Sequence, residues 1–253
     1  MSNTTDRFTS RVANYVKWRL DYPQALYDAL RSEGILQDDA VIADIGAGTG
    51  ISTLLFATNN HRVFAIEPNA SMREAGQEFL ASHPLTTWHS GTADKTSLPD
   101  HCADAVVAAQ AWHWFDTPET VAEFRRILKP GGQVILIWND RITTGDGFSE
   151  AYEDAVRYFA IDYDKVDHKQ FGEAAFNKLW GKDGWKETHA NNLQHLTFEG
   201  LLGRVLSSSY MPDETHPEFE FMKHVLKKIF LRYQENGTVD MLYHTRAFHG
   251  QLN

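Results

Sequence analysis

The sequence predicts an α/β fold in which strands alternate with helices, and three neighbouring stretches indicate it. Residues 40–45 form an apolar run with the length and β-branched content of a strand buried on both faces. Glycines follow at alternate positions, and residues 51–57 then have the apolar character of a helix. A second short apolar run, residues 62–66, ends at the carboxylate of Glu67. The order strand, glycine turn, helix, strand is typical of an α/β unit.

The turn after the first strand has the composition of a ligand-binding turn. Its glycines, Gly46, Gly48 and Gly50, can take positive φ and leave no Cβ between the backbone and a bound molecule. The following helix N-terminus exposes unpaired N–H groups that can hold an anionic group. Glu67 lies 17 residues after Gly50, close to the spacing at which an acid receives ribose hydroxyls. A nucleoside-binding unit is therefore favoured over a turn that merely connects strand to helix.

The spacing of the glycines separates two classes of nucleoside ligand. The dinucleotide fingerprint would place its third glycine at Ile51, whereas this chain has Gly50 and carries Asp44 two residues before Gly46. The pattern D-x-G-x-G-x-G resembles the first motif of class I S-adenosylmethionine (SAM)-dependent methyltransferases. This resemblance implies that the turn approaches the methionine part of SAM and that Glu67 binds the ribose.

The same resemblance implies further residues that would bind SAM or its product, S-adenosylhomocysteine. Asn69 and Met72 would flank the adenine, although a methionine on a helix is more often part of the core. Residues 92–94 would hold the adenine edge, and Gln110 would lie beside the methionine part. The complete expected set is Tyr15, Arg19, Asp44, Gly46, Ala47, Gly48, Thr49, Gly50, Glu67, Pro68, Asn69, Met72, Thr92, Ala93, Asp94, Gln110 and Ala111.

Residues 110–116, Gln-Ala-Trp-His-Trp-Phe-Asp, directly follow a predicted central strand, where ligands bind in open α/β sheets. The run resembles that of small-molecule methyltransferases of the "type 11" domain and, more distantly, trans-aconitate methyltransferase. His113 and Asp116 are the candidate catalytic residues near the transferred methyl, whereas at least two of the three aromatic side chains are expected to anchor the loop. His113 could take a proton from an oxygen or nitrogen acceptor. A carboxylate acceptor would need only cationic clamps such as Arg19, and the sequence leaves both open.

The resemblance also implies the whole architecture: a Rossmann-like seven-stranded sheet in the order 3-2-1-4-5-7-6, its last strand antiparallel, with helices on both faces and a helical substrate cap. We expect one domain, 1–253, with N-terminal lid helices in 1–36, a SAM-binding core in 37–140, a cap insertion in 141–185, and C-terminal strands and helices in 186–253. In the lid, Tyr15 and Arg19 would contact the methionine end of SAM or the substrate, with packing as an equal alternative. Trp18 is expected to pack.

Local signals set the bounds of the remaining elements. Pro23 and Gly34 suit the start and stop of a helix over 24–33. Pro68 ends the second strand before a helix that runs to about residue 82. Thr117 and Pro118 suit the start of a helix that ends near Leu128-Lys-Pro-Gly-Gly132, where the chain reverses. The other expected strands are 86–94 with its loop, 102–110, 133–139, 186–198 and 239–248, and the other helices are 145–163, 171–180, 199–207 and 217–236.

Composition limits the partners. The chain has 253 residues and a net charge of −10, which argues against a nucleic-acid partner because phosphate binding needs a basic surface. Its single cysteine, Cys102, gives neither a disulfide framework nor a cysteine metal cluster and is consistent with the cytoplasm. No apolar run approaches the ~20 residues that span a bilayer, so we expect no membrane partner. The expected partner is a small-molecule methyl acceptor, and the chain is expected to be a monomer or homodimer without a metal.

Two other classes of function remain open. An NAD-dependent oxidoreductase is disfavoured by Ile51 and by the lack of a Ser-Tyr-Lys or metal site. A SAM-binding protein without catalysis, acting as a sensor or partner subunit, would show the same motifs. Arg204, Tyr210 and His216 fall where substrate-facing loops would be, although lone polar residues in such a region are more often structural.

Overall fold

The computed structural model describes residues 17–161, 172–208 and 210–252, which divide into two compact units. Of these residues, unit 1 holds 17–20, 140–161, 191–208 and 210–244. Unit 2 holds 21–139, 172–190 and 245–252. The predicted SAM-binding turn, the acid after the second strand and the run 110–116 all lie in unit 2.

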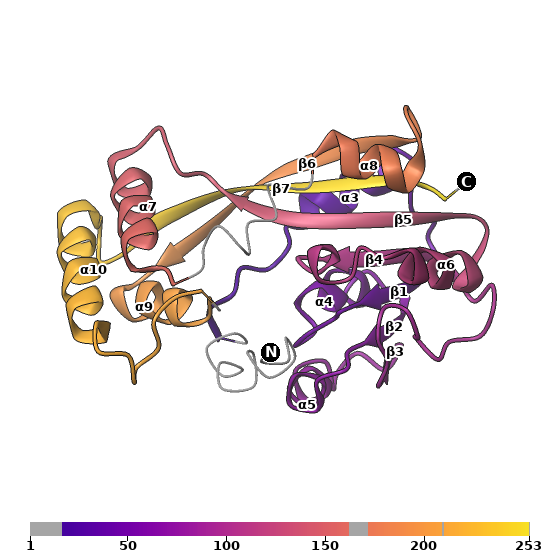
Figure 1. Ribbon diagram of the computed structural model, residues 1–253, viewed down its shortest axis with the longest axis horizontal. Helices are drawn as coiled ribbons and strands as arrows, with labels where there is room; N and C mark the ends of the chain where they lie inside the picture. The colour runs from indigo at the N-terminus through magenta and orange to yellow at the C-terminus, as the bar shows by residue number, and fades with distance from the viewer. Residues whose placement is uncertain (1–16, 162–171, 209, 253) are drawn as a thin grey trace. The chain divides into compact units, whose positions relative to one another are not determined.

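One seven-stranded mixed sheet has the order β3-β2-β1-β4-β5-β7-β6, which confirms the predicted fold. β1 pairs in parallel with β2 and with β4, while β2 pairs with β3 and β4 with β5, also in parallel. Figure 1 shows β7 running opposite to its neighbours β5 and β6. The strands are β1 (Val41–Ile45), β2 (Arg62–Ile66), β3 (Thr86–His89), β4 (Ala103–Ala109), β5 (Leu128–Arg141), β6 (Trp185–Leu196) and β7 (Val239–Gln251).

The apolar runs of the central strands are explained by burial on both faces of the sheet. Successive side chains of a strand point to opposite faces, so Ile42 and Ala43 enter different cores. One face is covered by α3 (Gln24–Ser32) and α4 (Ile51–Ala57), whose Leu30 and Phe56 are fully buried. The other face is covered by α6 (Pro118–Ile127) and α8 (Glu173–Trp180).

The start of α6 and the end of α3 lie at or next to the residues that the sequence predicted. Thr117 caps α6 by accepting a hydrogen bond from Thr120 N, and Pro118 occupies the first turn. Gly34 has φ +73° directly after the C-cap of α3. The helix after Pro68 is α5 (Ala70–Phe79), which is shorter than the predicted span to residue 82.

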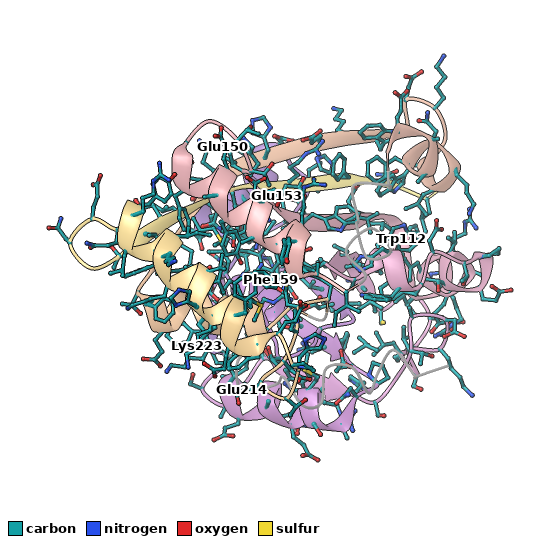
Figure 2. All side chains as sticks on the ribbon, turned by 60° about the vertical axis from the view of Figure 1, so that its left-hand side comes forward. Trp112, Glu150, Glu153, Phe159, Glu214 and Lys223 are labelled. Atoms are coloured by element: carbon teal, nitrogen blue, oxygen red, sulfur yellow. The ribbon has the colours of Figure 1, made fainter. Side chains whose placement is uncertain are left out.

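Unit 1 has a core of its own, built by α7 (Gly147–Phe159), α9 (Phe198–Leu206) and α10 (Phe219–Tyr233) with parts of the long strands. Figure 2 marks the length of α7 by Glu150, Glu153 and Phe159. Fully buried members of this core include Leu201, Val205 and Met222. The α10 helix packs against both α7 and α9.

The segment expected to form one cap, 141–185, divides between the units. Helix α7 belongs to unit 1, whereas α8 belongs to unit 2 and buries Trp180 in the core of the sheet. Burial of a large apolar side chain is stabilising, so Trp180 holds α8 against the face of the sheet that buries it. The role of residues 141–185 as a substrate cap stays a prediction.

The end of α6 differs from the predicted helix-turn-strand arrangement. Strand β5 begins at Leu128, immediately after the helix, and Pro130 and Gly131 lie within it rather than before it. The pairing with β4 shifts from Ala103 opposite Leu128 to Ala105 opposite Gln133, so the intervening residues bulge. Gly131 accommodates this irregularity with φ +80°.

None of the helices in the described ranges is both long and apolar enough to cross a membrane. The longest of them, α10, has 15 residues. A spanning helix needs ~20 predominantly apolar residues.

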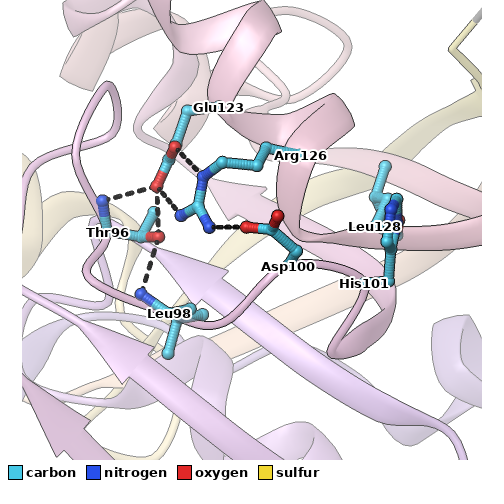
Figure 3. Close-up of polar contacts among 7 residues, drawn as sticks. All are labelled: Thr96, Leu98, Asp100, His101, Glu123, Arg126 and Leu128. Atoms are coloured by element: carbon cyan, nitrogen blue, oxygen red, sulfur yellow. Dashed lines mark hydrogen bonds and ion pairs between the residues drawn. The ribbon is translucent and has the colours of Figure 1, made fainter.

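A polar network ties the loop after β3 to α6 (Figure 3). The Glu123 carboxylate receives two hydrogen bonds from the Arg126 guanidinium, Nε at 2.8 Å and Nη2 at 2.7 Å, and another from Thr96 N at 2.9 Å. The hydrogen bonds from Arg126 and Thr96 hold the pKa of Glu123 at about 2, against the effect of burial. Asp100 completes the network as a second partner of Arg126. The loop that starts with residues 92–94 is therefore fixed onto a core helix.

We predict that Glu123→Gln lowers the free energy of unfolding by about 1–2 kcal/mol at pH 7. The folded-state pKa lies below the ordinary value of 4.5, so the stabilisation is complete above that value and disappears as pH falls toward 2. Urea unfolding at pH 7, 5 and 3 measures the difference between the two proteins. The exposed Glu119 on the same helix provides the control Glu119→Gln, for which no such pH-dependent difference is expected. A constant difference across this pH range would contradict the assigned role of the network.

Candidate functional site

The glycine turn lies where the order of strands reverses. β1 has β2 on one side and β4 on the other, and the loops that leave the carboxyl ends of β1 and β4 touch. A Cβ added to Gly46 would lie 3.0 Å from the Cβ of Ala111 and 3.3 Å from the ring of Phe115. Open α/β sheets bind ligands at this switch point. The predicted turn and the predicted 110–116 loop are therefore brought together.

The three glycines of the turn have different physical reasons to lack a side chain. All take positive φ, from +58° at Gly48 to +87° at Gly50. A Cβ at Gly50 would come within 2.8 Å of Leu80, and one at Gly46 would press on Ala111, so protein packing excludes both. A Cβ at Gly48 would meet only the methyl of Met72, at an ordinary 3.5 Å. Gly48 is thus the position of the turn whose backbone is open to a ligand.

Glu67 links the turn to the end of β2. Its Oε2 accepts a hydrogen bond from Gly48 N at 2.9 Å, and its Oε1 accepts one from Asn69 N at 2.8 Å. The side chain is buried, and this burial raises the pKa of Glu67 despite the two backbone donors, which lower it. Each carboxylate oxygen can still accept a further hydrogen bond, as ribose hydroxyls require.

Asp44 clamps the first turn of α4 onto β1. Its Oδ2 accepts hydrogen bonds from Ser52 Oγ at 2.7 Å and Thr53 Oγ1 at 2.6 Å. The side chain is fully buried, and this burial raises the pKa of Asp44 to about 6, against the effect of the two hydroxyls. Within the part of the chain that the structure describes, its Oδ1 has no hydrogen-bond partner. Thr49 Oγ1 in the glycine turn is buried and unsatisfied in the same way.

The residues expected beside the adenine have local structural roles as well. Asn69 caps α5 by accepting a hydrogen bond from Met72 N at 3.0 Å, and Met72 is buried against Gly48. The Pro68 carbonyl faces Arg73, at 3.4 Å from Nη1. Met72 is therefore a buried residue that lies next to the open glycine. This position is compatible with a core role and with an adenine contact.

The loop after β3 is held beside the end of β2. Glu67 N donates to His89 O at 3.1 Å, and a Cβ at Gly91 would approach Ile66 within 3.2 Å. Reciprocal hydrogen bonds between the backbones of Thr92 and Lys95, both 3.1 Å, form a tight turn. Within this turn Ala93 is buried and Asp94 is exposed.

Gln110 ends β4 in a conformation that is rare for residues other than glycine. Its φ is +55°, its N–H donates to Ile137 O at 2.8 Å, and its Nε2 donates to Asn139 O at 3.4 Å. Backbone strain of this kind persists only where surrounding contacts enforce it, and it gathers at functional sites. Ala111 follows, buried against Gly46.

The two candidate catalytic residues occupy the short 3-10 helix Trp112–Trp114 and the loop after it. His113 is half-buried, with its ring 4.7 Å from that of Trp114. The Asp116 carboxylate faces Lys178 of α8 at 3.7 Å. Trp112 is buried and contacts Phe115 edge-on, which confirms that two of the three aromatic residues anchor the loop.

Two predicted SAM contacts lie outside the described residues of unit 2, and their role stays a prediction. Tyr15 lies outside the described residues. Arg19 belongs to unit 1, where its Nη2 donates to Ser207 O at 3.0 Å. Trp18 packs closely against Gly203 of α9, as predicted.

Three residues that the sequence interpretation passed over support the site. Ser52 and Thr53 orient Asp44, and Arg73 Nη1 donates to Glu67 O at 2.7 Å, which fixes the turn after β2. The sequence contained a signal for Ser52 and Thr53. Both are hydroxyl residues in the first turn of a predicted helix, a short loop after the acid of a buried strand. Arg73 carries no comparable signal, because lysines and arginines on exposed helix faces are common.

Comparison with known proteins agrees with the fold. Residues 43–136 match the family model described as "Methyltransferase domain". An uncharacterized methyltransferase of Mycobacterium tuberculosis (strain H37Rv) is 36% identical over 134 residues, which cover 53% of this chain and 52% of that protein. The chain thus spans about half the length of that relative. An uncharacterized methyltransferase-like protein of Schizosaccharomyces pombe is 26% identical over 248 residues, covering 95% of this chain and 93% of the relative.

Solved structures show the same architecture. A putative type II methyltransferase from Anaeromyxobacter dehalogenans superposes with a TM-score of 0.61 and 20% identity, covering 92% of this chain and 97% of that one. Residues 43–136 thus match a methyltransferase domain, and the sheet has the strand order of the Rossmann-like methyltransferase fold. The more distant likeness to trans-aconitate methyltransferase stays a prediction.

We predict that Asp44→Asn raises the free energy of unfolding by about 1–3 kcal/mol at pH 8. The folded-state pKa, about 6, lies above the ordinary 3.8, so the cost of burying the carboxylate is present above pH 6. This cost decreases as pH falls toward 3.8, and the advantage of the Asn variant should decrease with it. Unfolding by urea at pH 8, 6 and 5 measures this difference. The exposed Asp94 supplies the control Asp94→Asn, and an Asp44→Asn variant less stable than wild type at pH 8 would contradict the prediction.

Proposed function

We propose that this protein transfers a methyl group from SAM to a small-molecule acceptor. The observation that carries the proposal is the contact between Gly48 and Glu67, because it combines an open backbone with an acid at the end of the neighbouring strand. The match of residues 43–136 to a methyltransferase domain supports the reaction class. The acceptor and the catalytic residues are our inference from the site.

The residues present fit SAM in three respects. Gly48 carries no Cβ, so its backbone is open to the ligand. The Glu67 carboxylate can accept hydrogen bonds from the ribose hydroxyls. Asp44 has a buried oxygen without a partner among the described residues, which could accept a hydrogen bond from a cationic group. Thr49 adds a second unsatisfied buried atom. We assign the binding of SAM to the following residues: Asp44, Gly46, Ala47, Gly48, Thr49, Gly50, Glu67, Pro68, Asn69, Met72, Thr92, Ala93, Asp94, Gln110 and Ala111, with Tyr15 and Arg19 from the N-terminal lid.

Methyl transfer mainly requires the protein to position the acceptor in line with the methyl group of SAM. When bound, SAM supplies an activated methyl on a sulfonium, so an in-line displacement by the acceptor suffices. The loop 110–116 would hold the acceptor and exclude water from it, and its buried anchor Trp112 keeps it in place. His113 would take the proton from an oxygen or nitrogen acceptor. Asp116 would attract a cationic group of the acceptor, as it attracts Lys178.

The remaining assignments belong to the same proposal. Residues 1–36 would form a lid and 141–185 a cap within a single methyltransferase domain. The partner would be a small molecule and not a nucleic acid or membrane, and the protein would act in the cytoplasm as a monomer or homodimer. The net charge of −10 and the single cysteine support these assignments.

A calorimetric titration tests the cofactor. We expect saturable binding of S-adenosylhomocysteine and no heat from NAD. Incubation with methyl-labelled SAM and a panel of small molecules then tests transfer. Binding of NAD instead of S-adenosylhomocysteine would overturn the proposal, and binding without transfer across the panel would favour a non-catalytic SAM-binding protein.

We predict that Gly48→Ala weakens S-adenosylhomocysteine binding at least tenfold and lowers stability by about 1–2 kcal/mol. The added methyl would enter the open space, and positive φ strains an alanine. Gly34→Ala is the matched control, because Gly34 also has positive φ and a Cβ added there would meet no atom within 4 Å. It should lose similar stability but keep full affinity. Equal affinities of the two variants would show that Gly48 does not approach the ligand.

A further inference from the structure

Unit 1 contains two arginines whose guanidinium groups are not fully satisfied. Arg141 stands at the end of β5 and Arg204 in the last turn of α9. Arg141 Nη1 and Arg204 Nε are buried and have no hydrogen-bond partner within the described part of the chain. Buried guanidinium N–H groups normally find an acceptor, and such orphans point to a missing one.

The two arginines share one neighbour. The Arg141 guanidinium lies over the ring of Tyr152, 4.7 Å from its centroid, and both arginines interact electrostatically with this tyrosine. Burial raises the pKa of Tyr152 to about 12, against the effect of Arg141 and Arg204, so its hydroxyl is neutral at physiological pH. Tyr243 and Tyr210 also surround Arg204. Tyrosine side chains therefore lie close to both arginines, and the buried Tyr152 brings no negative charge.

The positive charge of this cluster exceeds its negative charge. Glu153 accepts from Arg141 at 2.5 Å, and the same carboxylate faces Arg157 at 2.8 Å (Figure 2 labels Glu153). Arg204 hydrogen-bonds Ser208 Oγ at 2.9 Å and Tyr243 and pairs with no acid among the described residues. Among the mostly buried groups, Arg141, Arg204 and Glu153 sum to one positive charge, and Arg157 is left out of this sum because its side chain is 63% exposed. A buried charge without a counter-charge is destabilising unless a ligand provides one.

The structural interpretation of Arg204 does not account for these observations. A cation near a helix C-terminus stabilises the helix dipole, and Arg204 is in that position. This effect requires neither burial of Nε nor a second arginine from another element. We propose that unit 1 holds a binding site for a carboxylate group, built by Arg204 and Arg141 around Tyr152. A monoanion matches the single excess charge, and the planar carboxylate matches the guanidinium geometry.

Sodium benzoate is the probe, and benzamide is its neutral counterpart of the same shape. Titrated into the full-length protein at constant ionic strength and without SAM, benzoate should bind saturably and benzamide should not. Because no SAM is present, the outcome is independent of the proposed methyl transfer. Equal binding of benzamide, or binding of inorganic phosphate but not of benzoate, would overturn the proposal.

Variants locate the site. Arg204→Met should reduce benzoate affinity at least tenfold, as expected for the loss of a charge-assisted hydrogen bond, and should leave the midpoint of thermal unfolding unchanged or raise it. Arg141→Gln should reduce affinity in the same way. Arg157→Gln, which removes the exposed partner of Glu153, should retain it. A lower unfolding midpoint for Arg204→Met would indicate a structural arginine, and unchanged affinity of this variant, or equal loss in Arg157→Gln, would place the anion elsewhere.

Discussion

The hydrogen bond from Gly48 N to Glu67 Oε2 is the contact on which the candidate site depends. It joins the turn after β1 to the end of β2, where the N–H groups of Gly46 and Ala47 also donate to Ile66 O, at 2.9 and 3.1 Å. Because Glu67 accepts a second backbone hydrogen bond from Asn69, the start of α5 is tied to the same carboxylate. One acid thereby orients a turn, a strand end and a helix, while its oxygens can still accept further donors.

Two buried acidic side chains, Asp44 and Glu67, lower the stability of this arrangement when they are ionised. Burial raises the pKa of both Asp44 and Glu67, so ionising either within the fold is unfavourable. Hydroxyls of Ser52 and Thr53 offset part of this cost at Asp44, and backbone N–H groups do so at Glu67. A fold that needed only stability could replace Asp44 by a neutral residue. Its fully buried position suits a function in which a bound cationic group balances the charge.

The charged side chains of the two units differ in how completely their hydrogen bonds are satisfied. In unit 2, Glu123 and Arg126 form a satisfied network that fixes the loop after β3. In unit 1, Arg141 and Arg204 have buried N–H donors that find no acceptor among the described residues. The contrast matters because a satisfied network rigidifies structure, whereas an unsatisfied one is destabilising until something binds.

Patterns along the chain predicted the fold class and the position of the glycine turn, and the family resemblance that they carry implied the strand order. These patterns are apolar runs of strand length, the spacing of Gly46, Gly48 and Gly50, and the Thr117-Pro118 helix start. The folded protein was needed to show that packing excludes side chains at Gly46 and Gly50 while Gly48 stays open, because the neighbours Ala111, Leu80 and Met72 come from elements distant in sequence. It was also needed to show that Arg204, one of several lone polar residues in the sequence, and Arg141 both act on the buried Tyr152. Propensity and spacing act along the chain, whereas packing and charge balance depend on which elements meet in three dimensions.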